Sequence, residues 1–296
     1  MNFLKSLFGG KTETTEEKKQ EENAKNFEVL KYDGVRALRS SQWEYAIKCF
    51  THALEIKDDL EIRDYLSEAL LHNNELLPAY EQLQKLAEAQ PDNEGIFLKM
   101  ANVAYMMEDY GAMSDACEKA LLINKDDPQV LGLYARACLG QDDQVNAVAM
   151  LTKAISLKED YQEAYLLRGE TLLKMGEIKG AEEDVDYLLQ QVKDNEDVLL
   201  LKARVNEAKG EHNDAINVYN KVIETDPFSV IAFKERGAIK LAQGDKGGAE
   251  EDMKAVLELD PEKAKEVNGE YNAEGTEDIQ RKVEDAYKNN NPFGLG

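Results

Sequence analysis

The sequence repeats itself at a fixed interval, and this period restricts the possible folds more than any other feature. The stretch RGETLLKMGEIKGAEEDV at residues 168–185 returns as RGAIKLAQGDKGGAEEDM at residues 236–253, which is 68 residues later. A weaker copy, KARVNEAKGEHNDAINVY, lies midway at residues 202–219, so the repeating unit is 34 residues long. Such a period is typical of arrays in which small supersecondary units stack on one another.

Small residues recur at two places of this unit. Aligned on the period, the chain contains seven units: 27–60, 60–93, 94–127, 128–161, 162–195, 196–229 and 230–263. The eighth place is small in every unit and holds Gly34, Ser67, Ala101, Ala135, Gly169, Ala203 and Gly237. The twentieth place is small in six units, and only Met113 departs from this. Because residues without bulk let two backbones approach closely, both places mark a contact between elements.

The apolar places predict a pair of helices in each unit. Places four, seven, eight and eleven share one face of a first helix, and places twenty, twenty-four and twenty-seven share one face of a second. Glycine marks the junction at Gly176, Gly210 and Gly244, and proline ends the second helix at Pro91, Pro227 and Pro261.

The pattern resembles the tetratricopeptide repeat family over residues 27–263, about four fifths of the chain. The resemblance implies an all-α fold, an α-solenoid in which antiparallel helix pairs form a right-handed superhelix. The chain departs from the family pattern at Asp33, where the seventh place is usually apolar, and at Met113. Units one, three, four and five also lack the terminal proline.

The start of the chain differs from the repeats. Residues 1–26 are predicted to be a disordered segment and linker, because residues 11–26 are charged and polar. The apolar cluster between Phe3 and Phe8 is too short for a signal peptide or a membrane span. Two interpretations of residues 1–8 stay open: an anchor or docking peptide at a membrane or partner, and a start that folds onto the first repeat or onto nothing.

The end of the chain is predicted to close the array. Residues 264–288 form a predicted capping region, and residues 289–296 a flexible tail. Thr276 can cap a helix whose apolar stripe would cover the face that the last repeat leaves open. This stripe consists of Ile279, Val283 and Tyr287.

Composition excludes several classes of function. The net charge is −23, and such a surface repels phosphate backbones, so nucleic-acid binding is not expected. Cys49, Cys117 and Cys138 have no metal-ligand spacing and are interpreted as reduced thiols of a cytoplasmic protein. The three histidines lie in different units, and no phosphate-binding loop, calcium loop or nucleophile motif is present. The sequence therefore predicts no catalytic residue, no metal site and no cofactor.

Arginine and aspartate recur sixteen residues apart in two units. Arg168 and Asp184, like Arg236 and Asp252, would link the first helix of their unit to the second. Intra-repeat ion pairs are the favoured interpretation, and contacts to a ligand are the alternative.

Candidate binding residues come from the resemblance. In the tetratricopeptide family, places two, five, nine and twelve of the first helix line a concave groove that holds a peptide. Leucine fills the fifth place in three units, and the twelfth place either lines the groove or packs against the next unit. The ninth place alternates in charge, which predicts either a structural ladder or capture of an acidic partner group. The predicted partner-binding residues are Leu98, Tyr105, Arg136, Leu139, Leu166, Leu173, Leu200 and Arg204.

The sequence thus predicts a non-enzymatic scaffold that binds a protein or peptide in a leucine-lined groove. A charge of −23 opposes acidic partners, so the partner is expected to be neutral to basic overall. The scaffold is expected to be a monomer or simple dimer, and the alternatives are a self-assembling structural protein or a subunit of an enzyme complex. The family's pattern for gripping the tails of heat-shock chaperones is not matched, since Val35 follows Lys31 where asparagine is required.

Overall fold

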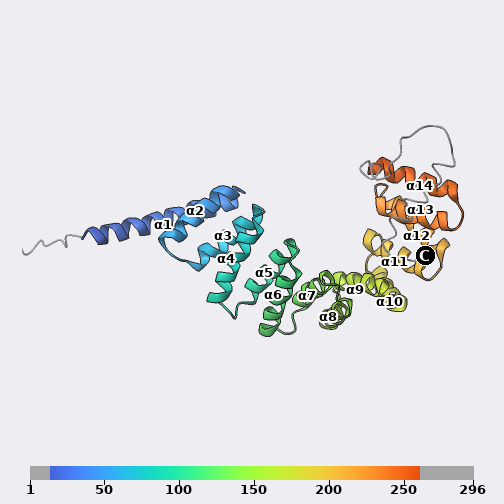
Figure 1. Cartoon of the computed structure of the whole chain (residues 1–296), viewed down its shortest axis with the longest axis horizontal. Helices are drawn as coiled ribbons and strands as arrows, with labels where there is room; N and C mark the ends of the chain where they lie inside the picture. The colour runs from blue at the N-terminus through green and yellow to red at the C-terminus, as the bar shows by residue number, and fades with distance from the viewer. Residues whose placement is uncertain (1–13, 261–296) are drawn as a thin grey trace, which may run out of the picture. The chain divides into compact units, whose positions relative to one another are not determined.

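The computed structural model describes residues 14–260, and in this range the chain forms fourteen helices and no strand (Figure 1). The helices are α1 (Thr15–Arg39), α2 (Trp43–Ile56), α3 (Leu60–His72), α4 (Leu76–Ala89), α5 (Glu94–Met106), α6 (Tyr110–Ile123), α7 (Pro128–Gly140), α8 (Gln144–Leu157), α9 (Gln162–Lys174), α10 (Ile178–Gln191), α11 (Glu196–Ala208), α12 (His212–Thr225), α13 (Val230–Ala242) and α14 (Lys246–Leu259). Within each compact unit successive helices pack against each other, and the fold is an all-α solenoid, as predicted.

The chain divides into two compact units, which are described separately. The first contains α1 to α7, and the second contains α8 to α14. Within the first, α1 pairs with α2, α3 with α4 and α5 with α6; within the second, α9 pairs with α10, α11 with α12 and α13 with α14. The count of seven repeats stays a prediction, because α7 and α8 belong to different units.

The turn inside each pair has the same backbone conformation at the same place of the period. Gly176, Gly210 and Gly244 have φ angles of 81°, 78° and 87°. Non-glycine residues take a positive φ in the three pairs of the first unit, at Ser41, Asn74 and Glu108, and Asp142 does so after α7. All seven residues stand at the fifteenth place of the period, directly after the C-cap residue of a helix. A left-handed residue at this position ends the helix and reverses the chain, which is the reason that glycine recurs there.

The small residues at the eighth place permit close contact, as predicted. A Cβ atom added to Gly34 would lie 2.5 Å from Cε1 of Phe50 in α2. A Cβ atom on Gly169 would lie 2.9 Å from Cδ2 of Leu201 and 3.3 Å from Cβ of Asp184. Gly169 therefore touches both the second helix of its own pair and the first helix of the next.

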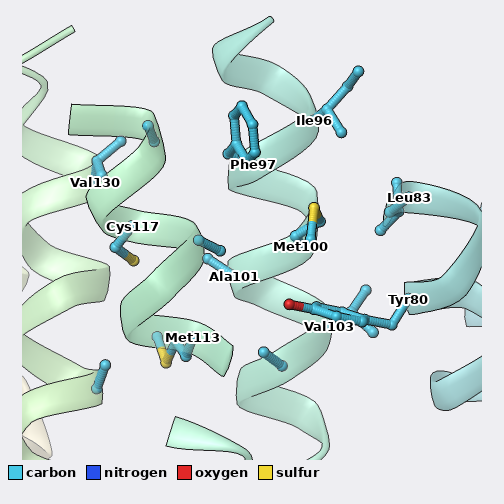
Figure 2. Close-up of a cluster of buried hydrophobic side chains, with 14 of the residues drawn as sticks. Tyr80, Leu83, Ile96, Phe97, Met100, Ala101, Val103, Met113, Cys117 and Val130 are labelled. Carbon is cyan, nitrogen blue, oxygen red and sulfur yellow. The ribbon is translucent and has the colours of Figure 1, made fainter. Parts of the chain in front are cut away.

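Each unit has its own hydrophobic core between neighbouring pairs. Figure 2 shows the core of the first unit, with Tyr80 and Leu83 of α4, Met100, Ala101 and Val103 of α5, Met113 and Cys117 of α6, and Val130 of α7. The second unit buries Ala181, Val185 and Leu188 of α10 against Val198, Leu201 and Val205 of α11. All three cysteines are buried free thiols, and burial raises the pKa of Cys117 to about 12, so this thiol stays protonated.

The start of the described chain corrects one prediction. Residues 1–26 were expected to be disordered, yet α1 begins at Thr15 and includes residues 15–26. Thr14 and Glu17 form a capping box, and Lys25 pairs with Glu21 one turn away, so local interactions favour the helix. Residues 1–13, the capping region at 264–288 and the tail at 289–296 lie outside the described residues.

The two predicted arginine–aspartate pairs are present in the second unit. Nε of Arg168 donates to Oδ2 of Asp184 at 2.9 Å, and Nε of Arg236 donates to Oδ2 of Asp252 at 3.0 Å. Both aspartates are buried, and each arginine makes a second bond to its carboxylate through Nη2. Each arginine also bonds the preceding pair, since Arg168 donates to Thr152 of α8 and Arg236 to Asn220 of α12. The two arginine–aspartate ion pairs therefore stabilise the packing against the preceding helix as well as the packing within their own helix pair.

Replacing Gly169 by leucine is expected to lower the free energy of unfolding by about 1–3 kcal/mol, because the new side chain meets Leu201 and Asp184. Gly247 is the matched control, since the nearest atom to a Cβ there lies 4.0 Å away. Urea unfolding monitored by circular dichroism measures both. Equal stability of Gly169→Leu and Gly247→Leu would show that the eighth place is not a close contact.

Replacing Asp184 by alanine is expected to cost about 3–5 kcal/mol, because Arg168 is left partly buried without its partner. Glu183→Ala removes a neighbouring carboxylate that is 70% exposed, and this change should cost below about 1 kcal/mol. Chemical denaturation compares the two variants. A cost for Asp184→Ala no larger than that for Glu183→Ala would contradict a structural role of the pair.

Candidate functional site

The first helices of neighbouring pairs lie against one another and carry the predicted binding residues. In the first unit α5 contacts α7, and in the second unit α9 contacts α11. Leu98 and Tyr105 stand on α5, and Arg136 and Leu139 on α7. The remaining four stand on α9 and α11: Leu166, Leu173, Leu200 and Arg204. The structure thus divides the predicted residues between two faces, one in each unit.

We call the first set the α5–α7 face; it consists of Leu98, Asn102, Tyr105, Arg136 and Leu139. Leu98 is partly buried and packs against the core, whereas Tyr105 is 43% exposed. The exposed Asn102 lies one helical turn from both, and its Nδ2 donates to the carbonyl of Leu98 at 2.9 Å. Arg136 and Leu139 are partly buried on the neighbouring helix. This face therefore combines an open aromatic ring with apolar and polar neighbours.

Leu200 corrects the prediction that fifth-place leucines look away from the helix pair. It is 4% exposed and belongs to a core cluster with Ala232 and Ile239 of α13. The next helix pair covers it, since Ala232 and Ile239 of α13 belong to the same cluster. Leu166 and Leu173 differ from it, since they are partly buried and lie at the edge of another cluster.

Arg204 has a structural partner. Its Nε lies 3.0 Å from Oε2 and its Nη2 2.9 Å from Oε1 of Glu235 on α13. The hydroxyl of Tyr219 on α12 donates to the same carboxylate at 2.9 Å. Of the two alternatives for the ninth place, these bonds favour a structural role, because the guanidinium already holds a bidentate carboxylate.

Glu207 was not among the predicted site residues. It stands at the twelfth place of its unit on α11, where the six other units have leucine or tyrosine. Its side chain is partly buried and makes no hydrogen bond or ion pair within residues 14–260. Burial raises the pKa of this carboxyl, and the negative charge of Glu235 adds to the increase, while Arg204 opposes it. A departure from the apolar pattern was the signal in the sequence that could have identified it.

Two further observations limit what the described residues can do. Between residues 14 and 260, no group of three or more histidine, cysteine, aspartate or glutamate side chains is arranged to hold a metal ion. None of the helices in the same range combines the length and the apolar character needed to cross a membrane.

Comparison with known proteins gives matches to repeat proteins. The family model described as the EMC2 TPR-like repeat domain matches residues 184–274. The chain is 23% identical over 254 residues to human protein O-mannosyl-transferase TMTC3, covering 79% of this chain and 27% of that protein. It is also 23% identical over 292 residues to chicken DnaJ homolog subfamily C member 3, covering 97% and 53% respectively. The chain thus spans about a quarter and about half of these two relatives.

A solved structure agrees with the fold along most of the chain. A tetratricopeptide repeat protein from Parabacteroides merdae superimposes with a TM-score of 0.67 at 16% identity, covering 88% of this chain and 99% of that one. At this identity the match establishes the fold alone. The 34-residue period, the helix pairs and these matches agree with the predicted resemblance: residues 184–274 match a TPR-like repeat model, and the fold is that of a solved tetratricopeptide repeat protein.

Proposed function

We propose that the chain is a non-enzymatic scaffold that binds a protein or peptide segment on the α5–α7 face. The observation that carries the proposal is the exposure of Tyr105, 43% of which is open to solvent on a first helix. Aromatic side chains are frequent anchors of protein interfaces, because they bury a large area and lose little conformational entropy. Leu98 stands about two turns before Tyr105 on α5, and the partly buried Leu139 stands on the neighbouring α7.

Polar groups on the same face support recognition of a peptide backbone. The carboxamide oxygen of Asn102 remains free to accept a hydrogen bond when its Nδ2 donates to Leu98. The Tyr105 hydroxyl can donate or accept at the rim. An amphipathic helix or an extended strand would therefore find both apolar contacts and hydrogen-bonding groups here.

Charge favours a partner that is neutral to basic overall. The whole chain carries −23, so an acidic partner is repelled and a basic one attracted during encounter. We therefore expect apolar anchors with few acidic residues.

The test uses twelve-residue peptides displayed on phage. The library is depleted on immobilised Tyr105→Ser and then selected on the wild-type full chain. Enriched peptides should contain aromatic or aliphatic anchors, and fluorescence anisotropy should show binding to Tyr105→Ser weaker by about 1–3 kcal/mol. The reason is that truncation removes a ring buried by the peptide.

Tyr32→Ser is the matched control, since Tyr32 is 68% exposed on α1. Binding to this control should equal binding to the wild type, and circular dichroism should show equal helical content in all three proteins. The proposal fails if depletion leaves no binder, or if Tyr32→Ser weakens binding as much as Tyr105→Ser.

A further inference from the structure

Unit 196–229 departs from the repeat pattern at two places in opposite directions. At the twelfth place it has the acidic Glu207, whereas the other six units have leucine or tyrosine. At the thirty-third place it has the aromatic Phe228, whereas the other units have acidic residues: Asp59, Asp92, Asp126, Asp160, Asp194 and Glu262. A charge thus stands where the repeat is apolar, and an aromatic ring where the repeat is charged.

Phe228 is exposed on an ordered loop. It is 74% exposed between α12 and α13, and Ile231 in the first turn of α13 is 47% exposed. The backbone N–H of Phe228 donates to Asp226, and Ser229 caps α13 while its hydroxyl donates to Glu196. These hydrogen bonds fix the loop and keep the Phe228 ring exposed to solvent. Groups of exposed apolar side chains commonly mark interaction surfaces.

Glu207 lacks a compensating charge. It interacts with Arg204 on its own helix, Tyr219 on α12 and Glu235 on α13, and Glu170 on α9 also acts on Arg204. The hydrogen bonds of the Arg204 guanidinium go to Glu235 and not to Glu207. A partly buried carboxylate without a partner costs free energy, and a second cation would remove this cost.

We propose that Glu207, Phe228 and Ile231 form a docking face for a protein segment that carries a lysine or arginine several residues away from apolar side chains. The cation pairs with Glu207, and the apolar side chains cover Phe228 and Ile231. Arg204 joins α11 to α13 through Glu235 and thereby holds the two parts of the face in place. This site is separate from the α5–α7 face and does not depend on the function proposed for it.

The occupant follows from charge and length. A first helix rises about 15 Å from its second to its twelfth place, so the cation and the apolar anchors of the segment lie about that far apart. Twelve extended residues span about 40 Å and can reach both. An acidic segment is excluded, because it would bring further negative charge to Glu207 and Glu235.

The experiment selects for dependence on Glu207. A twelve-residue phage library is depleted on Glu207→Gln and selected on the wild-type full chain. Surviving peptides should carry lysine or arginine several residues away from leucine, isoleucine, phenylalanine or similar residues. They should bind wild type about tenfold more tightly than Glu207→Gln. Replacing that lysine by norleucine should cause the same loss on wild type and no further loss on Glu207→Gln.

Two controls separate this face from general effects. Glu224→Gln changes the net charge equally at an exposed position of α12 and should leave binding unchanged. Phe228→Ser should weaken the same peptides, whereas Leu122→Ser, at an 87% exposed site on α6, should not. The inference is overturned if no peptide survives depletion, if survivors lack a cation, or if Glu224→Gln weakens binding as much as Glu207→Gln. These outcomes leave the α5–α7 proposal standing, because that selection is made against Tyr105→Ser.

Discussion

The close approach of helices at residues without bulk is the constraint on which the rest of the structure depends. At Gly34 and Gly169 an added Cβ atom would lie within 3 Å of a neighbouring side chain. Since every first helix must also reverse direction at the fifteenth place, one backbone geometry recurs through the described chain. This geometry sets first helices side by side, and their exposed places become surfaces that other molecules can reach.

The period, the helix pairs and the arginine–aspartate pairs could be predicted because each depends on spacing along the chain. The exposure of Leu200 could not, since it depends on side chains of another helix, Ala232 and Ile239 of α13, that pack in the same cluster. The helix over residues 15–26 was missed because composition outweighed the local signals of Thr14 and Glu17. The spacing of residues along the chain therefore predicts which helices form, whereas the exposure of a side chain depends on contacts between neighbouring helix pairs.

The candidate sites illustrate the same division. Tyr105 was predicted from its place in the unit, and the structure shows its ring to be open. Arg204 was also predicted from its place in the repeat, yet only the structure shows that its guanidinium forms an ion pair with Glu235. Glu207 and Phe228 were visible in the sequence as departures from the pattern, and their significance appears once burial and exposure are known. Departures from a repeat are thus as informative about function as the repeat is about fold.

The central functional claim is that Glu207 is a partly desolvated carboxylate that pairs with a lysine or arginine of the bound segment. NMR of the side-chain carboxyl carbons, assigned by comparison with Glu207→Gln, measures its pKa directly. We predict a pKa above the ordinary glutamate value of about 4.3 in the free protein, because burial and Glu235 disfavour the charged form. Binding of a lysine-bearing peptide should lower that pKa. A free-protein pKa at or below the ordinary value would show a solvated or already paired carboxylate and would contradict the account.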